Sequence, residues 1–122
     1  MQTLIYISLI VNIVVLVPIL VLMIIKSPLV DHAWGSFTAS RGILMSIYFA
    51  ILVASVVLLI MPVAAFIFAL LSVQVIYKVT TPFTVRSLKN PVVISNLVIA
   101  TLHIFTVVSI FNSLGSQFTP IS

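Results

Sequence analysis

Four polar side chains stand inside long apolar stretches of this sequence, and they are the first place to look for chemistry. Asn12, Gln74, Asn96 and His103 are surrounded mainly by Leu, Ile, Val and Phe. Inside a membrane, each such group is costly unless it is hydrogen-bonded or serves a function. Gln74 falls near the end of its expected span and needs no special explanation. Asn12, Asn96 and His103 are therefore the intramembrane polar residues of interest.

His103 has the widest range of possible chemistry. Asn96 and Ala100 precede it by seven and three residues, so the three side chains share one helical face. A neutral imidazole there can bond across helices to Asn12, to a hydroxyl group or to another subunit. Alternatively, it can be an axial ligand of a haem or chlorophyll-type pigment, or hydrogen-bond a quinone. The sequence requires no cofactor, and a bis-histidine haem would need a histidine from a second chain.

Hydrolytic and metal chemistry have little support in the sequence. The single acidic residue, Asp31, lies beside His32 in a polar stretch, and the chain has no cysteine. We find no combination of serine, histidine and acid and no metal-ligand spacing. The expected spans contain no carboxylate, lysine or arginine, which argues against a proton-coupled or cation-coupled transporter. We therefore expect a protein that is not an enzyme.

Composition indicates the broad class. The chain is 63% hydrophobic and 5% charged, and its mean hydropathy is +1.47. Its apolar runs are long enough to cross about 30 Å of hydrocarbon, so we expect an all-α integral membrane protein with residues 1–122 in a single transmembrane domain. The net charge of +4 comes from basic residues that flank these runs. We interpret them as contacts to lipid headgroups and exclude nucleic acid as a partner.

The apolar runs predict four spans, at about 4–25, 43–60, 63–77 and 91–111. The stretch 43–77 decides the number, because as one straight helix it would be roughly 50 Å long. Pro62, near its middle, removes a backbone donor and disfavours the helical conformation of Met61, so two short spans fit better. The alternative is a three-span protein in which one long helix is kinked at Pro62.

The basic residues favour four spans. They all lie in the polar stretches 26–42 and 78–90, as Lys26, Arg41, Lys78, Arg86 and Lys89. Four spans place both stretches on one side of the membrane, which the positive-inside rule identifies as the cytoplasm, whereas three spans would divide them. Both termini are then non-cytoplasmic. We expect a bacterial inner membrane or an organellar membrane.

Local signals refine the two polar stretches. Asn90 followed by Pro91 marks the start of the last span, and Thr81 followed by Pro82 predicts a short interfacial helix over 82–88. In the other stretch, Trp34 is expected to anchor a loop at the headgroup level, beside a local ion pair of Asp31. That loop is also a candidate docking patch for a partner.

Small residues recur at helical spacing in the two central spans. They are Ser46, Ala50 and Ala54 in one span, and Ala65, Ala69 and Ser72 in the other. Small side chains let helices approach closely in lipid. One interpretation is that the two stripes pack against each other within the chain. The other is that at least one of them faces a partner protein.

Together these features predict a non-catalytic accessory or structural subunit of a larger membrane complex. An energy-transducing host, respiratory or photosynthetic, is the most natural one, with membrane lipids and other membrane subunits as partners. One alternative is a small homo-oligomeric transporter or channel, whose pore Asn12, Asn96 and His103 would line. Another is a haem-binding or pigment-binding membrane protein that uses His103 as the ligand.

Overall fold

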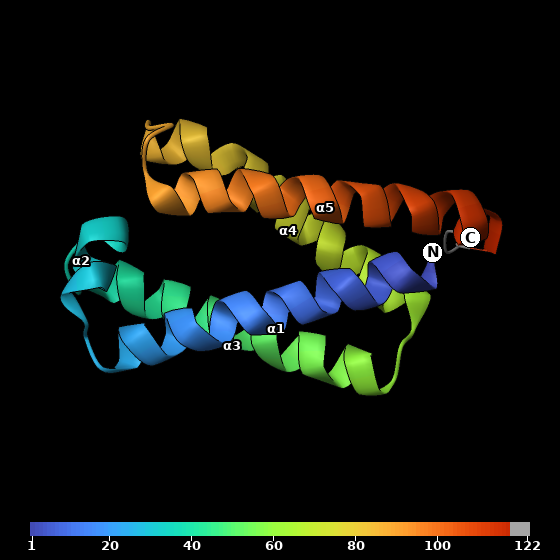
Figure 1. Ribbon diagram of the computed structural model, residues 1–122, viewed down its shortest axis with the longest axis horizontal. Helices are drawn as coiled ribbons and strands as arrows, with labels where there is room; N and C mark the ends of the chain where they lie inside the picture. The colour runs from blue at the N-terminus through green and yellow to red at the C-terminus, as the bar shows by residue number, and fades with distance from the viewer. Residues whose placement is uncertain (118–122) are drawn as a thin grey trace.

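The computed structural model describes residues 1–117 of the chain. Figure 1 shows its elements, which are α1 (Gln2–Ile24), α2 (Pro28–Trp34), α3 (Ala39–Ile60), α4 (Ala64–Val85), α5 (Pro91–Leu114) and the 3-10 turn η1 (Gly115–Gln117). Helices α1, α3, α4 and α5 are each long and apolar enough to cross a membrane. The prediction of an all-α protein with four transmembrane helices is confirmed, and no strand occurs in the described residues.

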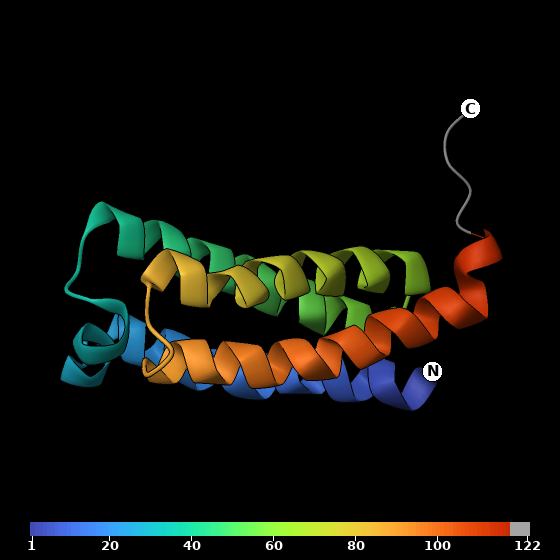
Figure 2. The same cartoon turned by 90° about the horizontal axis from the view of Figure 1, so that it is seen from above.

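The four long helices form two antiparallel pairs. Helix α1 packs mainly against α3, and α4 packs mainly against α5, while α1 and α5 make the closest link between the pairs. In Figure 1 the pairs approach each other at the end where the chain begins and separate toward the end that carries α2. Figure 2 shows α5 and α1 on one side of the bundle and α4 and α3 on the other. Helix α2 contacts both α1 and α5, and so occupies the wider end.

Two apolar clusters form the core, and the first of them joins the two pairs. One is centred on Leu9, Ile67, Leu71 and Ile110, all of them with no exposed surface, and lies toward the narrow end. The other includes Leu16, Leu20, Val30 and Tyr48 and joins α1, α2 and α3. Tight packing, rather than escape from water, stabilises helix contacts in lipid, so these interdigitated branched side chains position the polar groups between them.

The break between α3 and α4 lies at Pro62, as predicted. Helix α3 ends at Ile60, Met61 leaves the helical region with ψ at 79°, and α4 starts at Ala64. Proline cannot donate the next helical hydrogen bond, and its ring disfavours a helical residue before it. The three-span alternative with one long kinked helix is therefore wrong.

Helix α4 is longer than the sequence indicated. The expected end at residue 77 and the separate interfacial helix over 82–88 are both wrong, because α4 continues through Pro82 to Val85. Pro82 cannot donate to the carbonyl oxygen of Lys78, but the Thr81 hydroxyl donates to that oxygen at 2.7 Å. This replacement satisfies the freed acceptor and allows the helix to run on. The helix ends at Arg86, which adopts a left-handed conformation with φ of 58°.

The stretch 26–42 contains a helix that was expected to be a loop. The Ser27 hydroxyl accepts a hydrogen bond from the Leu29 amide at 3.3 Å, and Pro28 occupies the first helical position of α2. The ion pair of Asp31 is formed with Arg41 of α3, whose guanidinium also donates to the Gly35 carbonyl at 2.8 Å. Arg41 is almost completely buried. This contact fastens α2 to the start of α3.

The stripes of small residues do not pack against each other. Ser46 and Ala50 of α3 and Ala65 and Ala69 of α4 are exposed on the outside of the bundle, and Ala54 and Ser72 are half-buried. Helices α3 and α4 touch only slightly, because each has its main partner elsewhere. The expectation that these stripes join the two helices within the chain is therefore not met. A role in contacts with another chain stays a prediction.

Candidate functional site

A hydrogen-bonded cluster joins all four long helices at the middle of the bundle. The Asn12 side-chain nitrogen of α1 donates to Ser55 Oγ of α3 at 3.1 Å and to Gln74 Oε1 of α4 at 2.8 Å. The Asn12 Oδ1 atom accepts from Gln74 Nε2 at 3.1 Å and lies 3.0 Å from His103 Nε2 of α5. A carboxamide has two donor hydrogens and two acceptor positions, and Asn12 uses all four. We call Asn12, Ser55, Gln74 and His103 the Asn12 hub.

Each hub residue lies on the buried face of its helix. Asn12 and His103 are close to the midpoints of α1 and α5, and Gln74 is close to the midpoint of α4. All four side chains are buried, with exposed fractions of 5% or less. Because α4 runs to Val85, Gln74 is central instead of terminal, and the view that it needs no special explanation is wrong.

His103 is held by the hub in one definite state. Since Asn12 Oδ1 can only accept, His103 Nε2 is the donor, and in a neutral imidazole Nδ1 then carries the lone pair. His103 has no exposed surface, and its Nδ1 has no hydrogen-bond partner among the described residues. A bond across helices to Asn12, one of the three uses expected for this residue, is therefore what the structure shows. The nitrogen engaged by Asn12 is not free to ligate an iron atom.

A second polar contact lies one layer away from the hub. The hydroxyl groups of Ser8 and Thr106 are 2.7 Å apart, and both residues are completely buried. Thr106 Oγ1 also lies within hydrogen-bond distance of the Leu4 carbonyl, at 3.3 Å. This pair joins α1 to α5 in the same way that the hub does.

The wide end of the bundle holds a different kind of polar residue. Lys78 was expected in a loop as a headgroup contact, but it lies inside α4, seven residues or about 10 Å before Val85. Its exposed fraction is 5%. The Lys78 ammonium donates to Asn96 Oδ1 of α5 at 3.3 Å and lies 5.1 Å from the centre of the Tyr77 ring. The expectation that no lysine lies within a span is therefore wrong.

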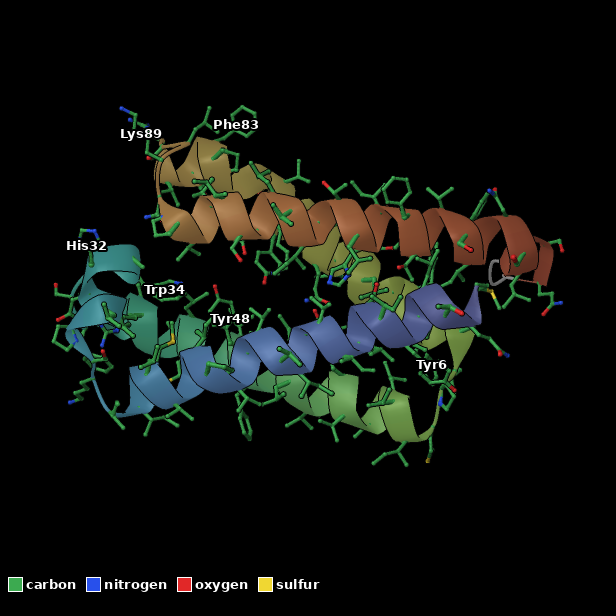
Figure 3. The ribbon with its side chains drawn as sticks, in the orientation of Figure 1. Tyr6, His32, Trp34, Tyr48, Phe83 and Lys89 are labelled. Atoms are coloured by element: carbon green, nitrogen blue, oxygen red, sulfur yellow. The ribbon has the colours of Figure 1, made fainter. Side chains whose placement is uncertain are left out.

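A cavity of about 340 Å³ opens beside Lys78, between α1 and α5; we call it the Lys78 cavity. Its walls are mainly apolar, with Val15, Leu16 and Ile19 on one side. Polar groups reach it from Lys78, Asn96, Ser95, His32, Trp34 and Tyr48. Figure 3 shows Trp34 and Tyr48 beneath the gap between the helix pairs, and the Trp34 indole donates to the Tyr48 hydroxyl at 3.3 Å. Trp34 is thus half-buried in the bundle, in addition to any role at the interface.

A second cavity, of about 460 Å³, lies on the other flank of α2, between α3 and α4. It shares Trp34, Tyr48 and Asn96 with the Lys78 cavity, and Thr81 and Tyr77 contribute to its walls. Asn96 therefore faces both cavities, and its amide nitrogen is 3.5 Å from Thr81 Oγ1. Residues of α2 line both cavities, and the Asn90 side chain holds α2 to α5 by donating to the Ala33 carbonyl at 3.0 Å.

Three of the other basic residues lie at the same end as Lys78 but on its surface. Lys26, Arg86 and Lys89 are exposed, and the Lys26 ammonium lies 5.1 Å from the centre of the Phe37 ring. In Figure 3, Lys89 points outward from the end of the α4 and α5 pair. The sequence grouped all five basic residues together, whereas the structure buries Lys78 and Arg41.

One signal in the sequence indicates that Gln74 and Lys78 of α4 are buried. Ile67, Leu71, Gln74 and Lys78 follow each other at intervals of four, three and four residues. That spacing defines one helical face, and these four are the buried residues of α4. Extending the apolar periodicity beyond residue 77 would have placed Gln74 and Lys78 inside the bundle.

Comparison of the chain with protein-family models, curated proteins and solved structures finds no match. Among the described residues there is also no group of three or more His, Cys, Asp or Glu side chains placed to hold a metal ion. The geometry of the Asn12 hub and of the Lys78 cavity is therefore the basis for any functional proposal.

Proposed function

We propose that the protein is a non-catalytic accessory subunit of a larger membrane assembly. The observation that carries this proposal is the saturation of the Asn12 side chain at the centre of the hub. Asn12 uses its full hydrogen-bonding capacity on Ser55, Gln74 and His103, and each partner comes from a different helix. Polar residues that line a pore or bind a cofactor need donors or acceptors turned toward water or a ligand. Here they bind one another and tie the helices together.

The outer surface supports contact with other membrane proteins. It is almost entirely apolar, with exposed Ile, Val and Phe side chains on all four long helices. Ser46 and Ala50 on α3, and Ala65 and Ala69 on α4, interrupt it with small side chains. A neighbouring helix can approach such faces more closely than it can approach Leu or Phe. An energy-transducing complex is the host that we propose.

The rival functions make other demands on the hub. A haem or pigment ligand would need an accessible imidazole nitrogen. His103 Nε2 is engaged by Asn12, and His103 Nδ1, which has no partner among the described residues, is buried inside the bundle. A channel would need polar side chains along a continuous path. The Asn12 hub instead lies between well-packed apolar clusters that include Leu9 and Leu71 on one side and Leu16 on the other.

Purification in a mild detergent tests the proposal. The tagged protein should run in native sizing as part of an assembly much larger than its 13.3 kDa chain, and mass spectrometry should identify other membrane subunits. Its own visible spectrum should be flat once those subunits are removed. A monodisperse homo-oligomer without other subunits would contradict the proposal and favour the transporter. A porphyrin absorption band that remains with the isolated chain would favour the pigment-binding alternative.

The proposed orientation has both termini outside the cytoplasm of a bacterial inner membrane, or on the corresponding side of an organellar membrane. The ends of α1 and α4 and the starts of α3 and α5 lie at one end of the bundle, together with all five basic residues (Figure 1). Basic residues favour the cytoplasmic side. Reporter fusions after Ser122 and within α2 should report opposite sides. The same side for both would overturn this orientation.

A further inference from the structure

We propose that the Lys78 cavity binds an anionic amphiphile, with an oxyanion headgroup at the Lys78 ammonium and an apolar chain along α1. The site is distinct from the Asn12 hub and is not needed for the accessory role. It rests on three observations: a buried positive charge without an anionic partner, an apolar cavity into which that charge faces, and a position at the basic end of the bundle.

The charge of Lys78 is unbalanced within the chain. Asp31 is the single acidic side chain in the sequence, and it pairs with Arg41. An ammonium group has three donor hydrogens, and Asn96 Oδ1 accepts one of them at 3.3 Å. No other hydrogen-bond acceptor for Lys78 occurs within residues 1–117. A buried cation is costly unless an anion or several acceptors compensate it, so a bound oxyanion would supply what the protein itself lacks.

The cavity has the composition of a ligand site. Pockets for small ligands have volumes of about 300–1,000 Å³ and combine apolar walls with a few placed polar groups. The Lys78 cavity, at about 340 Å³, fits this description. Asn96, Ser95 and His32 contribute further polar groups to its walls. Val15, Leu16 and Ile19 form an apolar wall. Such a site favours a ligand with one charged end and one apolar end.

The position explains how the ligand would arrive. The cavity lies at the wide end of the bundle, where Lys26, Arg86 and Lys89 are exposed. Surface cations attract anions to a membrane interface and raise their local concentration. An amphiphile that lies in the interface would enter between α1 and α5 with its headgroup at the level of Lys78. A free phosphate ion would gain nothing from the apolar wall.

Two kinds of molecule share this chemistry, namely an anionic phospholipid and a fatty acid. Both carry an oxyanion and an apolar chain, and the experiment separates them. Delipidated protein in a neutral detergent would be titrated with phosphatidylglycerol, palmitate, hexadecanol and inorganic phosphate, and the change in Trp34 fluorescence emission would be followed. We expect saturable binding of at least one of the first two ligands, and at least about tenfold weaker binding of the last two.

Three variants assign the binding to the cavity. Lys78→Met removes the charge with little change of shape and should weaken binding at least about tenfold, as expected for the loss of a charge-assisted hydrogen bond. Lys89→Met is the matched control, because it removes an exposed charge from the same end of the bundle. It should leave the affinity within about twofold. Ser95→Phe fills the cavity from its exposed rim and should abolish binding while Lys78 is retained.

Several results would overturn the proposal. Equal binding by wild type and Lys78→Met would show that the charge is not used. An equal loss of affinity in Lys89→Met would assign the effect to general surface charge. Equally tight binding of hexadecanol would show that the oxyanion is not needed. Equally tight binding of inorganic phosphate would show that the apolar chain is not needed. If Lys78→Met does not fold, Ser95→Phe decides: lost binding supports the cavity, and retained binding rejects it. If binding is supported, tighter binding of phosphatidylglycerol or of palmitate shows whether the ligand is a phospholipid or a fatty acid.

Discussion

The middle of the bundle and its wide end use polar residues in opposite ways. At the middle, Asn12 forms four hydrogen bonds that close on themselves and reach every long helix. At the wide end, Lys78 has one acceptor, an aromatic ring and a cavity beside it. The apolar surroundings are similar, but the Asn12 side chain has all its donors and acceptors paired, and the Lys78 ammonium has not. A saturated cluster stabilises a fold, whereas an unsaturated one can accept a ligand.

This contrast makes Asn12 the most sensitive position. Asn12→Leu would remove the shared partner of Ser55, Gln74 and His103 and leave their polar groups buried without compensation. We expect a loss of about 2–4 kcal/mol in the free energy of unfolding, since each orphaned group costs about 1–3 kcal/mol in general and less within a membrane. Denaturation with increasing SDS in mixed micelles would measure it. Thr3→Leu, on the exposed start of α1, is the control and should change stability little.

Substitutions of His103 test whether its hydrogen bond to Asn12 or the packing of its ring stabilises the bundle. His103→Leu should cost about 1–2 kcal/mol, because Asn12 Oδ1 loses one of its two donors. His103→Gln keeps a donor of similar reach and should retain most of the stability. Thermal unfolding of the two variants in the same detergent would compare them. Equal destabilisation by Gln and by Leu would show that packing of the ring, not its hydrogen bond, is what the bundle requires.

Removing the polar group of Lys78 should not lower the stability of the bundle as removing that of Asn12 does. In delipidated protein, Lys78→Met removes a buried charge and loses one hydrogen bond, while Asn96 keeps Thr81 as a neighbour. Replacing a buried charge with an apolar side chain of similar length is often neutral or stabilising. We expect the free energy of unfolding to stay within about 1 kcal/mol of wild type or to rise. A loss as large as that of Asn12→Leu would erase the distinction between the two regions.

The outer faces should show the smallest effect on the chain by itself. Ala50→Leu and Ala69→Leu enlarge side chains that are exposed, so the stability of the isolated bundle should change by less than about 0.5 kcal/mol. In the proposed assembly the same changes would obstruct a neighbouring helix. Co-purification of partner subunits should therefore fall for at least one of the two. Val53→Leu, on an exposed position that is already bulky, is the matched control.

The sequence by itself determined the class of fold and the number of spans. Apolar run lengths are a property of composition, and Pro62 disrupts a helix through its missing donor and its ring, wherever the helix packs. The start of α5 followed similarly from Asn90 and Pro91, where the Asn90 side chain accepts from the Val92 amide at 2.8 Å. Ser27 and Pro28 carry the same signal for α2, and that helix was within reach of sequence reasoning.

The partners of these elements were decided only by the tertiary structure. Adjacency in sequence suggested that α3 packs on α4, and small residues on both strengthened that view, but the helices pair as α1 with α3 and α4 with α5. Periodicity shows which residues share a face and not which helix that face meets. Helix α4 continues past Pro82, where the Thr81 hydroxyl donates to the Lys78 carbonyl oxygen, and in this longer helix Gln74 is central and Lys78 is buried. Convergence of four helices on Asn12 is a property of three-dimensional packing that no spacing within one helix encodes.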